Sequence, residues 1–108
     1  MNDTLKNLYE VVLQRKSSPH EGSYTCYLFD KGLDKILKKV GEECSETIIA
    51  AKNGNNTETV GEVCDLIYHL TVLMAQQGIS MDEVLGELDK RSQSIGNLKQ
   101  MHVTDKNT

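Results

Sequence analysis

Apolar residues recur every three or four positions along most of this chain, which is the spacing of amphipathic helices. A first segment with this pattern covers residues 3–16 and precedes a polar run around Pro19, which is predicted to be a loop. Residues 33–52 and 57–77 carry two further apolar stripes. The pattern therefore predicts a first helix followed by two longer ones.

Capping residues indicate where the later helices begin and end. Thr57 is a good N-cap for the second long helix, and Gly78 breaks that helix. Ser80 and Glu83 have the spacing of a capping box, which predicts a last helix ending near Arg91. The two long helices are joined by a short turn rich in Asn and Gly, so we expect them to pack antiparallel.

The segment 23–32 is ambiguous, because its aromatic and β-branched content allows a strand as readily as a short helix closed by Gly32. The chain contains no repeat and no alternation of strands with helices. We therefore expect an all-α fold, an antiparallel helical bundle built on two long helices. The domain is expected to span residues 1–91, and residues 92–108 are predicted to form a polar, frayed tail.

The composition limits how well this chain can fill a core by itself. It has 108 residues, with no Trp, one Phe and four Tyr. A single domain of this size with few large aromatic side chains gains stability by burying a shared face against a second copy. The composition therefore favours a homo-oligomer.

The charge and the hydropathy exclude several classes of protein. The formal net charge is -4, whereas a nonspecific nucleic-acid binder normally carries a basic surface. No apolar run approaches the ~20 residues of a membrane span. The N-terminus lacks the basic and apolar regions of a signal peptide, so a cytoplasmic protein is expected.

The three cysteines show no spacing typical of a disulfide framework or a zinc site. Cys44 and Cys64 both fall within helical patterns, where cysteine usually acts as a small buried apolar residue. We expect both side chains to be buried.

Carboxylates on the two long helices are the strongest candidates for chemistry. Glu43 and Glu46 lie three positions apart on the first of these helices, with Glu42 beside them. Glu62 and Asp65 have the same spacing on the second. Antiparallel packing can bring the two pairs to one level, where only a cation or basic partners would offset their repulsion. A site with oxygen ligands alone suits Mg²⁺ or Mn²⁺, although each pair taken separately is typical of a solvated helix face.

Each of the other polar residues near the carboxylates has two possible roles. His69 lies one turn beyond Asp65 and fits either a substrate contact or a histidine satisfied within a helix interface. Lys35 and Lys39 could supply charge to a polyphosphate, or could form ion pairs within the helix, such as Lys39 with Glu43. Three more basic residues have the same two readings, with an ordinary surface role as the default: Arg15, Lys16 and Arg91.

Several segments of the chain resemble the all-α nucleotide pyrophosphatase superfamily, and within it the phosphoribosyl-ATP pyrophosphatases of histidine biosynthesis. The resemblance runs from about residue 15 to residue 91. It rests mainly on three segments, which are Ser23-Tyr24-Thr25, the block from Lys39 to Glu46, and the run from Asp65 to Leu70. Their presence together and in this order makes the resemblance specific.

The resemblance implies an activity, a cofactor and an assembly. The reaction would be hydrolysis of phosphoribosyl-ATP between its α- and β-phosphates, giving phosphoribosyl-AMP and pyrophosphate, in an intertwined homodimer. Mg²⁺, or alternatively Mn²⁺, would be held by Glu43, Glu46, Glu62 and Asp65. Glu42 or Glu43 would orient the attacking water or accept its proton. The residues expected to contact substrate are Ser23, Tyr24, Thr25, Lys35, Lys39 and His69.

Two alternatives remain open at this point. A house-cleaning pyrophosphatase that acts on free (deoxy)nucleoside triphosphates would use the same carboxylates. A helical dimerisation module without catalytic activity would carry them as a solvated acidic face. Turnover of phosphoribosyl-ATP relative to dNTPs distinguishes the first alternative, and stabilisation by Mg²⁺ would argue against the second.

Overall fold

The computed structural model describes residues 2–94, which form helices and connecting turns without a strand. The all-α prediction is therefore confirmed for this part of the chain, whereas most of the predicted tail, from residue 95 onward, lies outside it. None of the helices within residues 2–94 combines the length and apolar character needed to cross a membrane. The helices are α1 (Thr4–Ser17), α2 (Tyr24–Lys31), α3 (Leu33–Lys52), α4 (Asn56–Gln77) and α5 (Met81–Ser92).

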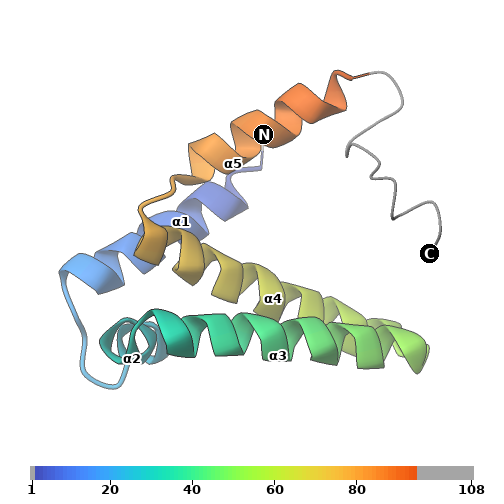
Figure 1. The fold of residues 1–108 in the computed structure, drawn as a ribbon, viewed down its shortest axis with the longest axis horizontal. Coiled ribbons are helices and arrows are strands. Elements are labelled where there is room, and N and C mark those ends of the chain that lie inside the picture. Colours follow the sequence, from blue (N-terminus) through green and yellow to red (C-terminus); the bar gives the residue numbers. More distant parts are fainter. Residues whose placement is uncertain (1, 95–108) are drawn as a thin grey trace.

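The two long helices, α3 and α4, lie side by side and antiparallel, as the sequence predicts (Figure 1). The short helix α2 packs at the N-terminal end of α3, while α1 and α5 lie near the C-terminal end of α4. The opposite end of the hairpin, where α3 turns into α4, extends away from these three helices (Figure 1). The α3–α4 hairpin is therefore packed against other helices at one end only, which we call the braced end.

The core lies at this braced end and draws one or more side chains from each helix. Val12 of α1, Leu28 of α2, Ile36 of α3 and Val72 of α4 are almost fully buried, and Met81 of α5 closes the cluster. Burying such side chains contributes roughly 1.5–3 kcal/mol each. Packing at this end therefore fixes how α2, α3 and α4 meet, and it positions the side chains of the candidate site.

The ambiguous segment 23–32 is a helix. The Ser23 side chain accepts a hydrogen bond from the backbone N–H of Cys26, which caps the helix N-terminus. Gly32 ends it with φ of 92°, a value that disfavours any residue with a Cβ. Leu28 faces the core and is fully buried, so tertiary packing decides between the two conformations that the residue types allow.

The N-terminus of α4 differs from the prediction. Its N-cap is Asn55, whose side chain accepts from the backbone N–H of Glu58, and the helix already begins at Asn56. The assignment of Thr57 as N-cap is wrong, because Asn caps a helix at least as well as Thr and occurs earlier in the turn. Two other predictions are confirmed: Gly78 ends α4 in the left-handed conformation, and a complete capping box starts α5.

A pair of variants tests the observed cap. Asn55→Ala should lower the free energy of unfolding by about 1 kcal/mol, since it removes the acceptor for an N-terminal backbone N–H. Thr57→Ala should change that free energy by less than about 0.5 kcal/mol, as usual for a surface substitution away from a cap. Urea denaturation measures both. A larger loss for Thr57→Ala than for Asn55→Ala would contradict the observed cap.

The apolar stripes of the long helices are largely exposed in the single chain. On α3, Ile48 is 68% exposed, and on α4 the side chains of Ile67 and Leu70 are also exposed. Cys44 and Cys64 are exposed as well, so the prediction that they are buried is wrong for this chain alone. The face that α3 turns to α4 is marked instead by buried residues at a spacing of seven positions, Ile36, Glu43 and Ala50.

Candidate metal centre and its surroundings

Three of the predicted carboxylates meet between α3 and α4. Glu43, Glu62 and Asp65 each offer an oxygen atom, and these atoms all lie within 4.8 Å of one another. Glu43 is only 9% exposed, because it occupies the side of α3 that faces α4. The antiparallel hairpin therefore brings the two acidic pairs to one level, as expected from their spacing.

This cluster lacks the partners that buried carboxylates need. Oε2 of Glu43 and Oε2 of Glu62 are buried and have no hydrogen-bond partner within the described part of the chain. Ionised carboxylate oxygens only accept hydrogen bonds, so neighbouring carboxylates cannot satisfy one another. Either a proton or a cation must lie between them. An all-oxygen donor set fits a hard divalent cation such as Mg²⁺.

Glu46 lies beside the cluster but does not belong to the group of three converging residues. It nevertheless raises the pKa values of Glu62 and Glu43. The pKa of Glu62 is raised to about 7, first because a protonated Glu62 could donate a hydrogen bond to Glu46, then by burial and by the charges of Glu46 and Glu43. Burial is the main cause that raises the pKa of Glu43, followed by the charge of Glu46. Glu46 is therefore close enough to share a proton, and by the same proximity a cation, with Glu62.

The raised pKa of Glu62 predicts how stability depends on pH when no metal is bound. The folded state holds the Glu62 proton more tightly than the unfolded state, whose value is near 4.5. The resulting stabilisation is fully present below pH 4.5 and is lost as the pH rises through about 7. In EDTA, the Tm of Glu62→Gln should therefore rise relative to that of wild type as the pH increases from about 5 to about 8. A constant difference in Tm between the two proteins would contradict this prediction.

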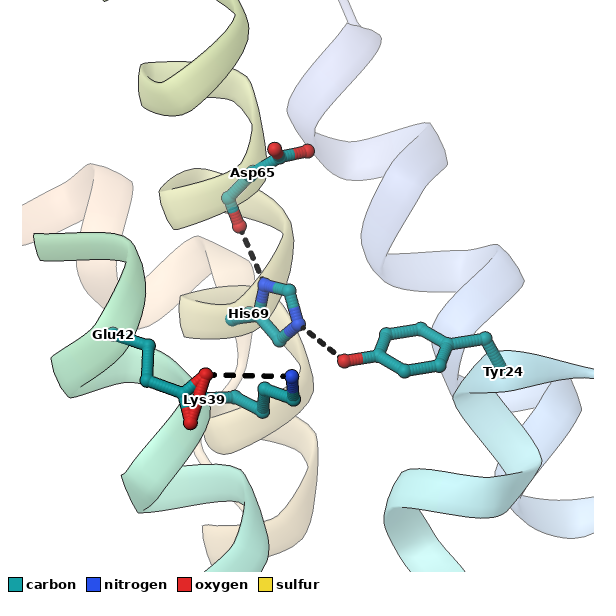
Figure 2. Close-up of polar contacts among 5 residues, drawn as sticks. All are labelled: Tyr24, Lys39, Glu42, Asp65 and His69. Atoms are coloured by element: carbon teal, nitrogen blue, oxygen red, sulfur yellow. Dashed lines mark hydrogen bonds and ion pairs between the residues drawn. The ribbon is translucent and has the colours of Figure 1, made fainter. Parts of the chain in front are cut away.

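A buried histidine lies next to the carboxylates, on the side facing α2 (Figure 2). Nδ1 of His69 is 2.7 Å from the backbone carbonyl oxygen of Asp65, and Nε2 is 2.9 Å from the hydroxyl oxygen of Tyr24. A carbonyl oxygen only accepts, so Nδ1 donates; in the neutral ring Nε2 then accepts from the Tyr24 hydroxyl. Both ring nitrogens are engaged, which matches the second reading of His69, a histidine satisfied within an interface. Its predicted contact with substrate stays a prediction.

The two lysines that are predicted to contact substrate, Lys35 and Lys39, make different contacts. Lys39 is 3.4 Å from a carboxylate oxygen of Glu42, so the helical ion pair joins these two residues; the predicted partner, Glu43, is wrong. Figure 2 shows the Lys39 amine on the same side of the hairpin as His69 and Tyr24. The pKa of Lys39 is raised by Tyr24 and then by Glu42. Lys35 instead lies over the ring of Tyr27, 5.9 Å from its centroid.

The Ser23-Tyr24-Thr25 segment makes contacts within the protein. The Ser23 side chain caps α2, and the Thr25 hydroxyl hydrogen-bonds with the hydroxyl of Tyr68 on α4. Tyr68 and Tyr24 both pack edge-to-face against the His69 ring. Two hydroxyl contacts, Thr25 with Tyr68 and Tyr24 with His69, therefore join α2 to α4. Sequence reasoning gave Tyr68 no role, although it lies in the run from Asp65 to Leu70.

Comparison with known proteins identifies the family. Residues 5–92 match the family model of phosphoribosyl-ATP pyrophosphohydrolase. A phosphoribosyl-ATP pyrophosphatase from Listeria welshimeri is 61% identical over 87 residues, which cover 81% of this chain and 84% of the relative. The protein with the same name from Clostridium novyi is 52% identical over 97 residues, 90% of this chain and 88% of the relative. The chain belongs to the phosphoribosyl-ATP pyrophosphohydrolase family.

Proposed function

We propose that this chain hydrolyses phosphoribosyl-ATP to phosphoribosyl-AMP and pyrophosphate in histidine biosynthesis, in the cytoplasm. The observation that carries the proposal is the group formed by Glu43, Glu62 and Asp65, with buried oxygens that have no partner in residues 2–94. A helical module without catalytic activity would have no reason to place three carboxylates together beside its core. The family membership supplies the substrate.

A divalent cation, Mg²⁺ or Mn²⁺, would be held by Glu43, Glu62 and Asp65, with Glu46 beside them. When bound, it would neutralise phosphate charge and stabilise the charge that develops on pyrophosphate as it leaves. Without such a cation, the clustered carboxylates would repel the phosphates of an anionic substrate.

The chain's own residues then orient the reacting groups. Cleavage between the α- and β-phosphates adds a water oxygen to one phosphorus and breaks a P–O bond of the anhydride, so that pyrophosphate leaves. Glu42 is half-buried and directly precedes Glu43 on α3, and we assign to one of these two residues the task of orienting this water or accepting its proton. Lys39 is paired with Glu42, and we assign to it the neutralisation of phosphate oxygens.

A specificity measurement tests the proposed substrate. The kcat/KM for phosphoribosyl-ATP should exceed that for dATP and dCTP by at least about 10²-fold, because a site that hydrogen-bonds a substrate group rejects an analogue lacking it. Equal or better turnover of dNTPs would favour the house-cleaning alternative. If the protein hydrolyses neither phosphoribosyl-ATP nor dNTPs with Mg²⁺ or Mn²⁺ present, that result would contradict an enzymatic role.

We also propose that the active form is a homodimer, joined through the apolar face of the hairpin. We take this face to comprise exposed apolar side chains of both long helices: Leu37, Cys44, Ile48, Val63, Cys64, Ile67 and Leu70. Its side chains come from both long helices and remain exposed in the single chain. A large apolar surface of this kind on a small domain marks an interface. A second copy would cover the face that α1, α2 and α5 leave open.

A further inference from the structure

A hollow of about 940 Å³ lies between the end of α1, the loop after it and α2. Its volume lies within the range of roughly 300–1,000 Å³ that is typical of small-molecule sites. The hollow on the acidic side of the hairpin, next to Glu46 and Glu62, measures only about 170 Å³. Residues that line the larger hollow include Arg15, Lys16, Glu21, Tyr24, Tyr27 and Asp30.

Tyr24 connects this hollow to the carboxylates. Its side chain lines the hollow, and its hydroxyl is 2.9 Å from Nε2 of His69. His69 lies one helical turn after Asp65 and is bonded to that residue's backbone carbonyl (Figure 2). The side chains of Tyr24 and His69, together with one turn of α4, therefore link the hollow to Asp65. A ligand with its triphosphate at the carboxylates can extend past Tyr24 into the hollow.

The lining combines charges of both signs. Arg15 and Lys16 approach from α1, and Arg15 forms no ion pair within residues 2–94. The Lys16 amine donates to the backbone carbonyl of Ala75, 3.1 Å away, which holds it at the wall of the hollow. Carboxylates of Glu21 and Asp30 also line the hollow. Cations that can bind a phosphate beside acceptors that can bind hydroxyl groups fit a sugar phosphate better than a bare anion.

We propose that this hollow binds the phosphoribosyl arm of the substrate, with Arg15 and Lys16 on its terminal phosphate. This inference rests on the proposed function, since phosphoribosyl-ATP carries a second ribose phosphate that ATP lacks. The arm and the triphosphate are the two anionic ends of the molecule. One end would meet Arg15 and Lys16 in the hollow, and the other would meet the cation that the carboxylates would hold. The hollow thereby separates phosphoribosyl-ATP from ordinary nucleoside triphosphates.

Neutralising the arginine tests the inference. Arg15→Gln should raise the KM for phosphoribosyl-ATP by about 10-fold or more, as expected for a lost charged hydrogen bond to phosphate. Its kcat should stay within about twofold, because the arm is remote from the reacting bond. Lys16→Gln should act in the same direction. The matched control is Lys6→Gln, which makes the same charge change on α1 at an exposed ion pair with Asp82 and should leave the KM unchanged.

A comparison of inhibitors separates this inference from the proposed function. Arg15→Gln should weaken inhibition by phosphoribosyl-AMP about 10-fold but leave inhibition by AMP, which lacks the arm, unchanged. If wild type hydrolyses phosphoribosyl-ATP while Arg15→Gln and Lys16→Gln retain its KM, the subsite is wrong and the proposed function stands. A parallel loss for AMP also contradicts the subsite. If wild type does not hydrolyse phosphoribosyl-ATP, both proposals fail.

Discussion

Asp65→Asn is expected to lower kcat for phosphoribosyl-ATP by about 10²–10³-fold, the usual effect of losing one group that stabilises charge in the transition state. Asp65 contributes one of the three converging oxygens, and an amide of the same shape binds a hard cation far more weakly. In the absence of metal, the variant should be at least as stable as wild type, because one of the repelling charges is gone. Steady-state kinetics over a range of Mg²⁺ concentrations, together with thermal melts in EDTA, measures both effects.

The matched control neutralises a carboxylate far from the cluster. Glu87→Gln removes the charge of an exposed side chain that pairs with Arg91 on α5, and an exposed pair contributes little to stability. Its activity and its Mg²⁺ dependence should equal those of wild type. Full activity in Asp65→Asn, with an unchanged Mg²⁺ dependence, would rule out the carboxylate site.

Ile48→Asp is expected to convert the dimer into monomers. Because we propose that the dimer is the active form, most of the hydrolysis of phosphoribosyl-ATP should be lost as well. Ile48 is 68% exposed in the single chain and lies on the apolar face of the hairpin, so the proposed interface would cover it. A charge buried there without a partner destabilises the dimer by several kcal/mol. Multi-angle light scattering across a range of protein concentrations measures the mass of each form.

The control for assembly places the same charge outside the apolar face. Leu88 is 55% exposed on α5, which lies outside the α3–α4 hairpin (Figure 1), so Leu88→Asp should leave the mass of wild type unchanged. A monomeric wild type at micromolar concentration would contradict the proposed homodimer. So would an Ile48→Asp variant that has the same mass and stability as wild type.

Local sequence signals predict much of this fold correctly. The periodic segments around α1 and α3 form helices close to the expected ranges, and the Ser80–Glu83 capping box is present. The prediction fails at Thr57, since the turn offers several good caps and only packing of the hairpin selects Asn55. Segment 23–32 is likewise decided by the burial of Leu28, which is a tertiary effect.

The candidate site, too, is predictable from the sequence only in part. The three-residue spacing of carboxylates, together with an antiparallel hairpin, suffices to predict that Glu43 approaches Asp65. It does not predict which apolar positions of α3 face α4, and the exposed side chain of Cys44 shows this. The Tyr24–His69 contact joins residues 45 positions apart, and helical periodicity carries no information about such pairs. The hollow beside Arg15 arises only once α1 and α2 pack together.

Product analysis of the wild-type protein with phosphoribosyl-ATP tests the proposed reaction most directly. Phosphorus NMR should show phosphoribosyl-AMP and pyrophosphate appearing in equal amounts when Mg²⁺ is present, and no turnover after EDTA, with activity restored by added Mg²⁺. This result is expected if the carboxylates of α3 and α4 hold a cation on which hydrolysis depends. Turnover that continues unchanged in EDTA, or release of orthophosphate in place of pyrophosphate, would contradict the account.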